Sequence, residues 1–137
     1  MEDQKKKQLP FTKQMALTLQ AEEMAITAVA IYFLTQHSLG LSFWTWIPLF
    51  LIPDLSMLGY ILGTRAGAFT YNLFHHRGIA LLIAAAGVFT HHEVVTAFGI
   101  LLFAHSSFDR MFGYGLKYED SFNHTSHGWT GKNAPPL

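Results

Sequence analysis

The sequence has no cysteine, and only 13% of its 137 residues are charged. Without cysteine, disulfides, thiolate metal sites and cysteine nucleophiles are excluded. Nine Lys and Arg balance nine Asp and Glu, and this neutrality argues against a nucleic-acid partner, which would require a basic excess. A phosphate-binding glycine loop and the GxSxG nucleophile motif are also absent. What remains is a chain that is 50% hydrophobic, with eight histidines as its main reactive groups.

Four apolar segments are each long enough to cross a membrane, which takes about 20 helical residues. Residues 79–89 are apolar on every side, so lipid is the natural solvent for such a helix. We therefore predict an all-α fold, a four-helix transmembrane bundle. Its helices are expected at about residues 15–37, 41–63, 66–90 and 93–112, within a membrane domain of residues 1–118. Residues 119–137 are expected to form a polar C-terminal tail.

The distribution of basic residues predicts how this bundle is oriented. The connections at residues 37–40 and 91–93 carry no Lys or Arg. The basic residues outside the apolar segments all fall at the opposite end of a four-crossing bundle: Lys5, Lys6, Lys7, Lys13, Arg65, Arg110, Lys117 and Lys132. Because cytoplasmic loops carry the excess of Lys and Arg, both termini are predicted to be cytoplasmic.

Four ionisable residues lie inside the predicted helices: Asp54, His75, His105 and Asp109. Each costs at least about 2.5–3.5 kcal/mol at membrane depth, so such groups usually mark a function or pair with one another. Counting along the helices places all four in the cytoplasmic half of the bundle, and His105 and Asp109 share one helix face at i and i+4. Two imidazoles and two carboxylates suit a divalent zinc, manganese or iron ion.

A metal-bound water would become a nucleophile for hydrolysis. We therefore hypothesise a membrane-embedded, metal-dependent hydrolase that acts on a lipid or phosphoester. Glu22 or Glu23, at the start of the first helix, would be the general base, and Arg77 or Arg110 would stabilise developing negative charge. His124 and His127 could complete the metal site from the tail.

Three other interpretations stay open. The polar residues could pair with one another for structural reasons alone. They could also serve a proton-coupled carrier or a lipid-binding membrane protein without a metal. Finally, Gly59 and Gly63 match the GxxxG packing motif, so the chain could be a helical scaffold subunit. The lipid bilayer is the expected partner in every case, and the sequence leaves room for a homo-oligomer.

Three strings carry a family resemblance: PDLSMLGY, which ends at Tyr60, YNLFH, which ends at His75, and AHSSFDRMFGYGLKY, which begins at Ala104. They resemble a group of small, mostly bacterial, integral membrane proteins that share a domain of unknown function. The resemblance covers about residues 15–131 and implies four membrane helices without implying an activity. It also implies a location in the bacterial inner (plasma) membrane.

The same resemblance marks further residues as part of the family pattern: Asp54, Asn72, His75, His105, Asp109, Arg110, Gly113, Tyr114, Gly115, Lys117 and Tyr118, with Glu22 or Glu23. This chain departs from the pattern at His76, where the family tends to have Thr, and at Ser126, which separates Thr125 from His127. A looser similarity to membrane-bound metal-dependent hydrolases rests on the order Pro-Asp, a His-containing string, then His-x-x-x-Asp.

Overall fold

A computed structural model describes residues 13–130, and the lysines at positions 5–7 and 132 lie outside the described residues. Within that range the fold is all-helical, as predicted, apart from one short hairpin. The elements in chain order are α1 (Lys13–Gln36), α2 (Phe43–Phe50), the 3-10 helix η1 (Ile52–Leu62), α3 (Thr64–His75), α4 (Arg77–Phe89), α5 (Glu93–Met111), β1 (His124–Thr125) and β2 (Gly128–Trp129).

Two of the four expected helices are broken. The second consists of α2 and η1, with Pro48 inside α2 and Pro53 at the start of η1. A 3-10 run of 11 residues is uncommon, because its hydrogen bonds have poor geometry. The third expected helix is bent by 45° between α3 and α4. At this bend His76 is extended and its ring accepts a hydrogen bond from the Ile79 amide, capping α4.

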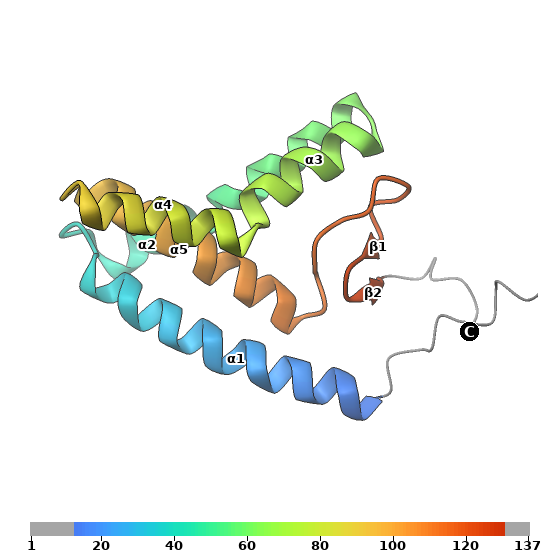
Figure 1. Ribbon diagram of the computed structural model, residues 1–137, viewed down its shortest axis with the longest axis horizontal. Helices are drawn as coiled ribbons and strands as arrows, with labels where there is room; N and C mark the ends of the chain where they lie inside the picture. Colours follow the sequence, from blue (N-terminus) through green and yellow to red (C-terminus); the bar gives the residue numbers. More distant parts are fainter. Residues whose placement is uncertain (1–12, 131–137) are drawn as a thin grey trace, which may run out of the picture.

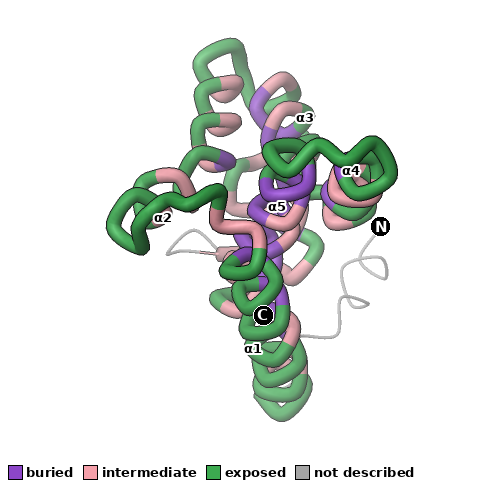
Figure 2. Tube along the Cα trace, turned by 90° about the vertical axis from the view of Figure 1, so that its left-hand side faces the viewer, coloured by how far each residue is buried: buried purple, intermediate pink, exposed green. Residues whose placement is uncertain are grey.

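The helices form two groups (Figure 1). In the first group α5 packs against α1 on one side and α4 on the other, and in the second group α3 runs beside η1. Buried positions gather along α5 (Figure 2). A Cβ atom at Gly99 would overlap the backbone of Ala84, so glycine allows α4 and α5 to approach closely.

The loops occupy opposite ends of the molecule. The α1–α2 and α4–α5 connections lie at one end, whereas the η1–α3 turn and the tail lie at the other (Figure 1). An ion pair joins the first two connections, with 2.9 Å between His37 Nδ1 and Glu93 Oε2. The second pair of connections is joined by Arg65 and Glu119, at 3.1 Å. The chain therefore runs back and forth between two ends.

Two helical segments are long and apolar enough to cross a membrane, Lys13–Gln36 and Phe43–Leu62. Thr64–His75 and Arg77–Phe89 would form a third if the bent pair counts as one span. Large apolar side chains on these segments are exposed, including Ile61, Leu62 and Phe69. Exposed apolar surface of this extent indicates a lipid environment.

Candidate metal centre

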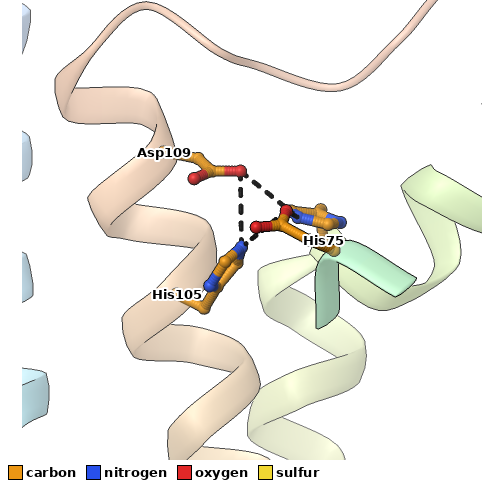
Figure 3. Close-up of side chains that lie close together, drawn as sticks. His75, His105 and Asp109 are labelled. Carbon is orange, nitrogen blue, oxygen red and sulfur yellow. Dashed lines mark hydrogen bonds and ion pairs between the residues drawn. The ribbon is translucent and has the colours of Figure 1, made fainter. Parts of the chain in front are cut away.

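Four side chains from three elements converge between the two helix groups. Asp54 comes from η1, His75 is the last residue of α3, and His105 and Asp109 come from α5. One ligand atom from each lies within 4.8 Å of all the others. Figure 3 shows His75, His105 and Asp109 directed toward one point. The structure thus brings together the four residues that the sequence predicts as metal ligands.

Each histidine Nε2 atom lies between the two carboxylates. His75 Nε2 is 3.6 Å from Asp54 Oδ1 and 3.3 Å from Asp109 Oδ2. His105 Nε2 is 3.2 Å from Asp54 Oδ1 and 3.5 Å from Asp109 Oδ2. Charge-assisted N–H···O bonds are usually about 2.7–2.9 Å. Zinc bound to N and O ligands at about 2.0–2.2 Å would set neighbouring tetrahedral ligands about 3.3–3.6 Å apart. The spacing is therefore compatible with ligands around an ion, although the 3.2 Å contact between His105 and Asp54 also meets the criteria of a hydrogen bond.

The other ring nitrogens are held by backbone carbonyl groups. His75 Nδ1 lies 2.9 Å from the Tyr71 carbonyl oxygen, and His105 Nδ1 lies 2.7 Å from that of Phe50. Because a carbonyl only accepts hydrogen bonds, each Nδ1 carries a proton and donates. In a neutral ring this leaves the Nε2 lone pair facing the centre, the arrangement typical of a metal-binding histidine.

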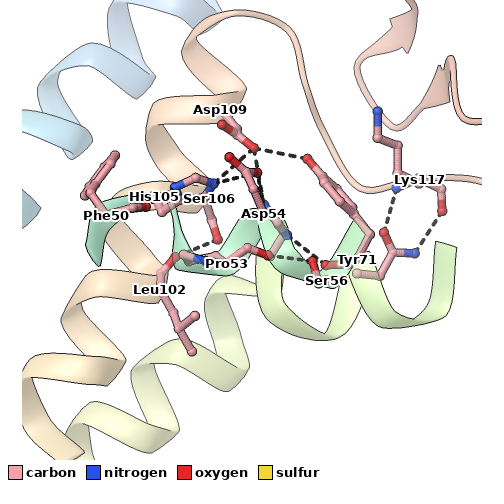
Figure 4. A network of polar contacts seen from close by, with 12 residues as sticks. Phe50, Pro53, Asp54, Ser56, Tyr71, Leu102, His105, Ser106, Asp109 and Lys117 are labelled. Atoms are coloured by element: carbon pink, nitrogen blue, oxygen red, sulfur yellow. Dashed lines mark hydrogen bonds and ion pairs between the residues drawn. The ribbon is translucent and has the colours of Figure 1, made fainter. Parts of the chain in front are cut away.

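The 3-10 geometry of η1 makes the Phe50 carbonyl available. In an α-helix the Asp54 amide would donate to Phe50, but here it donates to the Leu51 carbonyl at 3.1 Å. The released Phe50 oxygen accepts from His105 instead (Figure 4). Two side-chain hydroxyls also donate hydrogen bonds to backbone carbonyls of η1. Ser56 Oγ donates to the Pro53 carbonyl, and Thr70 Oγ1, from α3, donates to the Ser56 carbonyl.

Tyr71 supports two of the four candidate ligands. Its hydroxyl donates to Asp109 Oδ2 at 3.1 Å. Its ring stacks on the His75 ring, with centroids 3.8 Å apart and planes 9° apart. Sequence reasoning did not select Tyr71 as a site residue, although its position four residues before His75 on one helix was a usable signal.

The cluster is more open on its carboxylate side. The histidine side chains are 3% and 1% exposed, whereas those of Asp54 and Asp109 are 32% and 17% exposed. A ligand would therefore approach past the carboxylates. Two neutral imidazoles, two carboxylates and one divalent ion sum to zero charge, which lowers the cost of burying the ion. Two protonated imidazoles would balance the carboxylates equally well.

The predicted catalytic residues form a separate cluster. Arg77 Nη1 donates to Glu23 Oε2 at 2.7 Å and lies 3.4 Å from Ser107 Oγ. The charges of Arg77 and Glu23 also act on Arg110. Glu22 is exposed on α1. Neither glutamate belongs to the four-residue cluster, and Arg77 is paired with Glu23 rather than with a member of that cluster.

The described part of the tail is folded against α3. Asn72 clamps the backbone of Lys117, since its Nδ2 donates to the Lys117 carbonyl at 2.8 Å and its Oδ1 accepts from the Lys117 amide at 2.6 Å. The His124 ring stacks between the Tyr118 and Trp129 rings. Its Nδ1 lies 2.8 Å from Asp120 Oδ2. Residues 117–130 are thus folded against α3, and the hydrogen bonds to Lys117 give Asn72 a structural role.

The remaining candidates have varied positions. Tyr60 packs its ring on that of Phe122, and its buried hydroxyl has no hydrogen-bond partner within residues 13–130. The Tyr114 ring lies 5.6 Å from the Lys117 ammonium. Burial lowers the pKa of Lys117, which the charge of Asp109 opposes. Burial, with a smaller effect of Arg110, lowers the pKa of His127, which faces the Arg77 cluster.

Comparison with known proteins identifies the family. Residues 16–129 match the domain of unknown function DUF4260, and the chain belongs to that family. This confirms the resemblance seen in the sequence strings. No curated protein matches the chain. No solved structure matches it either.

Proposed function

We propose that this protein is a membrane-embedded metal-dependent hydrolase whose divalent ion is held by Asp54, His75, His105 and Asp109. The observation that carries the proposal is the common orientation of the two histidines. Both direct Nε2 at the carboxylates while Nδ1 donates to a backbone carbonyl. Proteins rarely bury two imidazoles and two carboxylates together without a functional reason. The donor set fits zinc, manganese or iron.

A divalent ion at this site would supply Lewis acidity and lower the pKa of a bound water. The protein residues hold the site in place. The Phe50 and Tyr71 carbonyls fix the imidazole rings, and the Tyr71 hydroxyl orients Asp109. Asp54 is the most exposed of the four, so substrate would enter beside it. The pairing of Glu23 with Arg77 gives no support to its general-base role, which stays a prediction.

A lipid substrate is supported by an apolar cavity of about 490 Å³ between α1, α2 and α5. Its lining includes Leu34, Trp46, Phe50 and Phe108. The Phe50 ring lies 5.3 Å from the His105 ring, so the wall of the cavity adjoins the cluster. Pockets of about 300–1,000 Å³ commonly hold small ligands.

Metal analysis of the full-length protein, purified in detergent, tests the metal site. We expect about one equivalent of zinc, manganese or iron in the wild type and none in a His105→Ala/Asp109→Ala variant. Asp120 and His124 offer a matched control, because they are also an ion-paired Asp and His four residues apart. Their double alanine variant should keep the metal. A metal-free wild type whose thermal stability is unchanged by all three ions would refute the proposal.

Hydrolysis is tested with the same variants. Phosphomonoesters and short-chain lipid esters would be supplied with each metal in turn. We expect turnover that a chelator abolishes, that added metal restores, and that the His105→Ala/Asp109→Ala variant lacks. A metal-loaded protein that cleaves neither class would leave metal binding intact and remove the hydrolase proposal.

The second candidate function is a proton-coupled carrier, favoured by the fact that two protonated histidines would also neutralise the carboxylates. Proton flux into proteoliposomes that survives chelation and disappears in Asp54→Asn would support it. The scaffold alternative receives less support, because a Cβ at Gly59 would overlap Thr70 of the same chain, whereas Gly63 forms the η1–α3 turn with φ 115°.

The proposed orientation has both termini on the cytoplasmic face of a bacterial inner membrane. The absence of cysteine makes single-cysteine labelling straightforward. In whole cells, a maleimide that does not cross membranes should label Ser38→Cys, in the α1–α2 connection, and spare Glu119→Cys in the tail. The reverse labelling pattern would show the opposite orientation. Labelling of both cysteine variants would contradict the proposed orientation.

A further inference from the structure

Lys117 is a largely buried residue near the candidate metal centre, and its ammonium nitrogen still reaches solvent. The residue is only 5% exposed. Asn72 fixes its backbone on both sides through the 2.6 and 2.8 Å hydrogen bonds (Figure 4). The clamp holds the residue after α5 against α3, the helix that also carries His75. The position of Lys117 is therefore set by the fold and not by contacts of its ammonium group.

Among the described residues, the contacts of the ammonium group are with aromatic rings. Its Nζ lies 4.1 Å from the ring centre of Phe122, 5.1 Å from that of Tyr71 and 5.6 Å from that of Tyr114. Within residues 13–130 it makes no hydrogen bond or ion pair. Its nitrogen is not among the buried atoms that lack a partner, so the ammonium still reaches solvent and its three N–H donors are open to water or to a bound anion. An ammonium that is held among aromatic rings, has no ion pair within residues 13–130 and is open to solvent can bind an anion there.

Tyr71 lies between the Lys117 ammonium and the candidate metal centre. Its ring contacts the Lys117 ammonium, and its hydroxyl donates to Asp109 Oδ2. The negative charge of Asp109 also acts on Lys117. One aromatic residue thus separates the ammonium from a candidate metal ligand. An anionic group bound at the metal would lie within reach of a lysine with four rotatable side-chain bonds.

We propose that Lys117 is the anion-binding residue of this site and that a phosphate group is the anion it binds. This inference rests on the proposed metal site and names its substrate class as a phosphate ester. A loaded cluster with two carboxylates is neutral, so a phosphate arriving there brings uncompensated negative charge. The Lys117 ammonium supplies the missing positive charge, as lysine does in many phosphate sites. Phospholipid headgroups and free phosphate esters share this chemistry.

Manganese-loaded full-length protein in detergent micelles provides the test. Paramagnetic relaxation of the ³¹P signal of inorganic phosphate reports binding near the metal. Lys117→Met removes the charge and keeps an unbranched side chain that packs well on aromatic rings. We expect it to retain manganese and to bind phosphate about 10- to 100-fold more weakly. Lys13→Met, at an exposed lysine of α1, is the matched control and should bind like the wild type.

The outcomes separate this inference from the metal proposal. Suppose that the wild type takes up manganese and that Lys117→Met and the wild type bind phosphate equally tightly. The inference about Lys117 is then wrong, and the metal proposal stands. If the wild type takes up no manganese, the metal proposal fails. Equilibrium dialysis with radiolabelled phosphate then decides the role of Lys117, and equal binding by wild type and variant overturns it.

A second measurement needs no variant and guards against misfolding. Acetic anhydride acetylates accessible lysines of the wild type, and peptide mass spectrometry gives the rate at each position. Phosphate should slow acetylation of Lys117 several-fold and leave Lys13 unchanged. Equal rates at Lys117 with and without phosphate would overturn the proposal. Competition by dihexanoyl phosphatidic acid, compared with inorganic phosphate, then distinguishes a lipid headgroup from a free phosphate.

Discussion

Replacing Tyr71 by Phe tests whether the cluster is built to hold an ion. The change removes one hydroxyl and keeps the ring that stacks on His75 and contacts Lys117. The lost hydrogen bond reaches Asp109 Oδ2 at 3.1 Å. Bonds to charged groups contribute about 1.5–3 kcal/mol, and 3.1 Å is long for a hydroxyl donor to a carboxylate. We therefore take the lower limit, about 1.5 kcal/mol.

Since 1.4 kcal/mol corresponds to a factor of ten, we expect Tyr71→Phe to weaken metal binding about tenfold. Residues that orient metal ligands usually contribute about 10- to 100-fold, so the two estimates agree. Competition between the purified protein and a chromophoric zinc chelator, at constant pH, measures the change. Tyr60→Phe is the matched control, because the Tyr60 hydroxyl is buried without a partner. Its loss should leave metal affinity within about twofold.

Two results would refute this reasoning. Equal zinc affinity in Tyr71→Phe and the wild type would mean that Asp109 is positioned without the hydroxyl or is not a ligand. A loss greater than about a thousandfold would exceed what one orienting hydrogen bond contributes. It would mean that the tyrosine oxygen itself binds the ion. An equal loss in Tyr60→Phe would indicate a general effect of removing hydroxyls.

Three further predictions concern the tail and the helix packing. Asn72→Ala removes both hydrogen bonds to the Lys117 backbone and should weaken tail docking by about 2–3 kcal/mol, seen as faster amide hydrogen exchange in the tail but not in α5. Because the pKa of His127 is lowered from 6.5 in the folded tail, docking should be strongest above that pH and weaken as pH falls toward the lowered pKa. Exchange corrected for intrinsic rates should show this loss, and His127→Asn should abolish it. Gly99→Ala places a methyl group against the α4 backbone and should destabilise the protein by about 1–3 kcal/mol in detergent unfolding, whereas Gly78→Ala meets only a rotatable side chain and should cost less.

The four candidate ligands could be predicted because membrane depth is a simple count along a helix. A rise of 1.5 Å per residue places Asp54, His75 and His105 at similar heights, and the cost of isolated charges in lipid favours their convergence. His105 and Asp109 needed no tertiary information, since i and i+4 always share a helix face. Their ligand atoms indeed lie within 4.8 Å of one another.

Pairing among the polar residues was one open interpretation, but membrane depth alone could not select Glu23 as the partner of Arg77. Both residues have suitable depth, but depth does not fix the rotation of a helix about its own axis. That rotation is read from a polar stripe, and the apolar exposure of α1 leaves the stripe poorly defined. Glu23 instead contacts Arg77 beside Ser107, and Ser107 is two residues from His105 and so on nearly the opposite face of α5.

The folded arrangement of residues 113–130 could not be predicted from the sequence either. Glycine, serine and asparagine over residues 113–130 are typical of a loop, and only a long-range contact makes them ordered. That contact is the clamp of Asn72 on Lys117, which joins residues 45 positions apart. An asparagine near the end of a helix can have many roles, so its presence in the sequence does not identify this contact with Lys117.

The helix breaks and the polar cluster depend on each other. A backbone carbonyl freed within a membrane must find a donor, because lipid provides none. The 3-10 turn at Pro53 frees the Phe50 carbonyl, and the buried ring of His105 supplies that donor. The same bond fixes the ring so that Nε2 faces Asp54. The cost of breaking the helix and the cost of burying an imidazole therefore offset each other. A His105→Phe protein would fill the space but leave the carbonyl unsatisfied, so the polar site is part of what holds this region in its bent form.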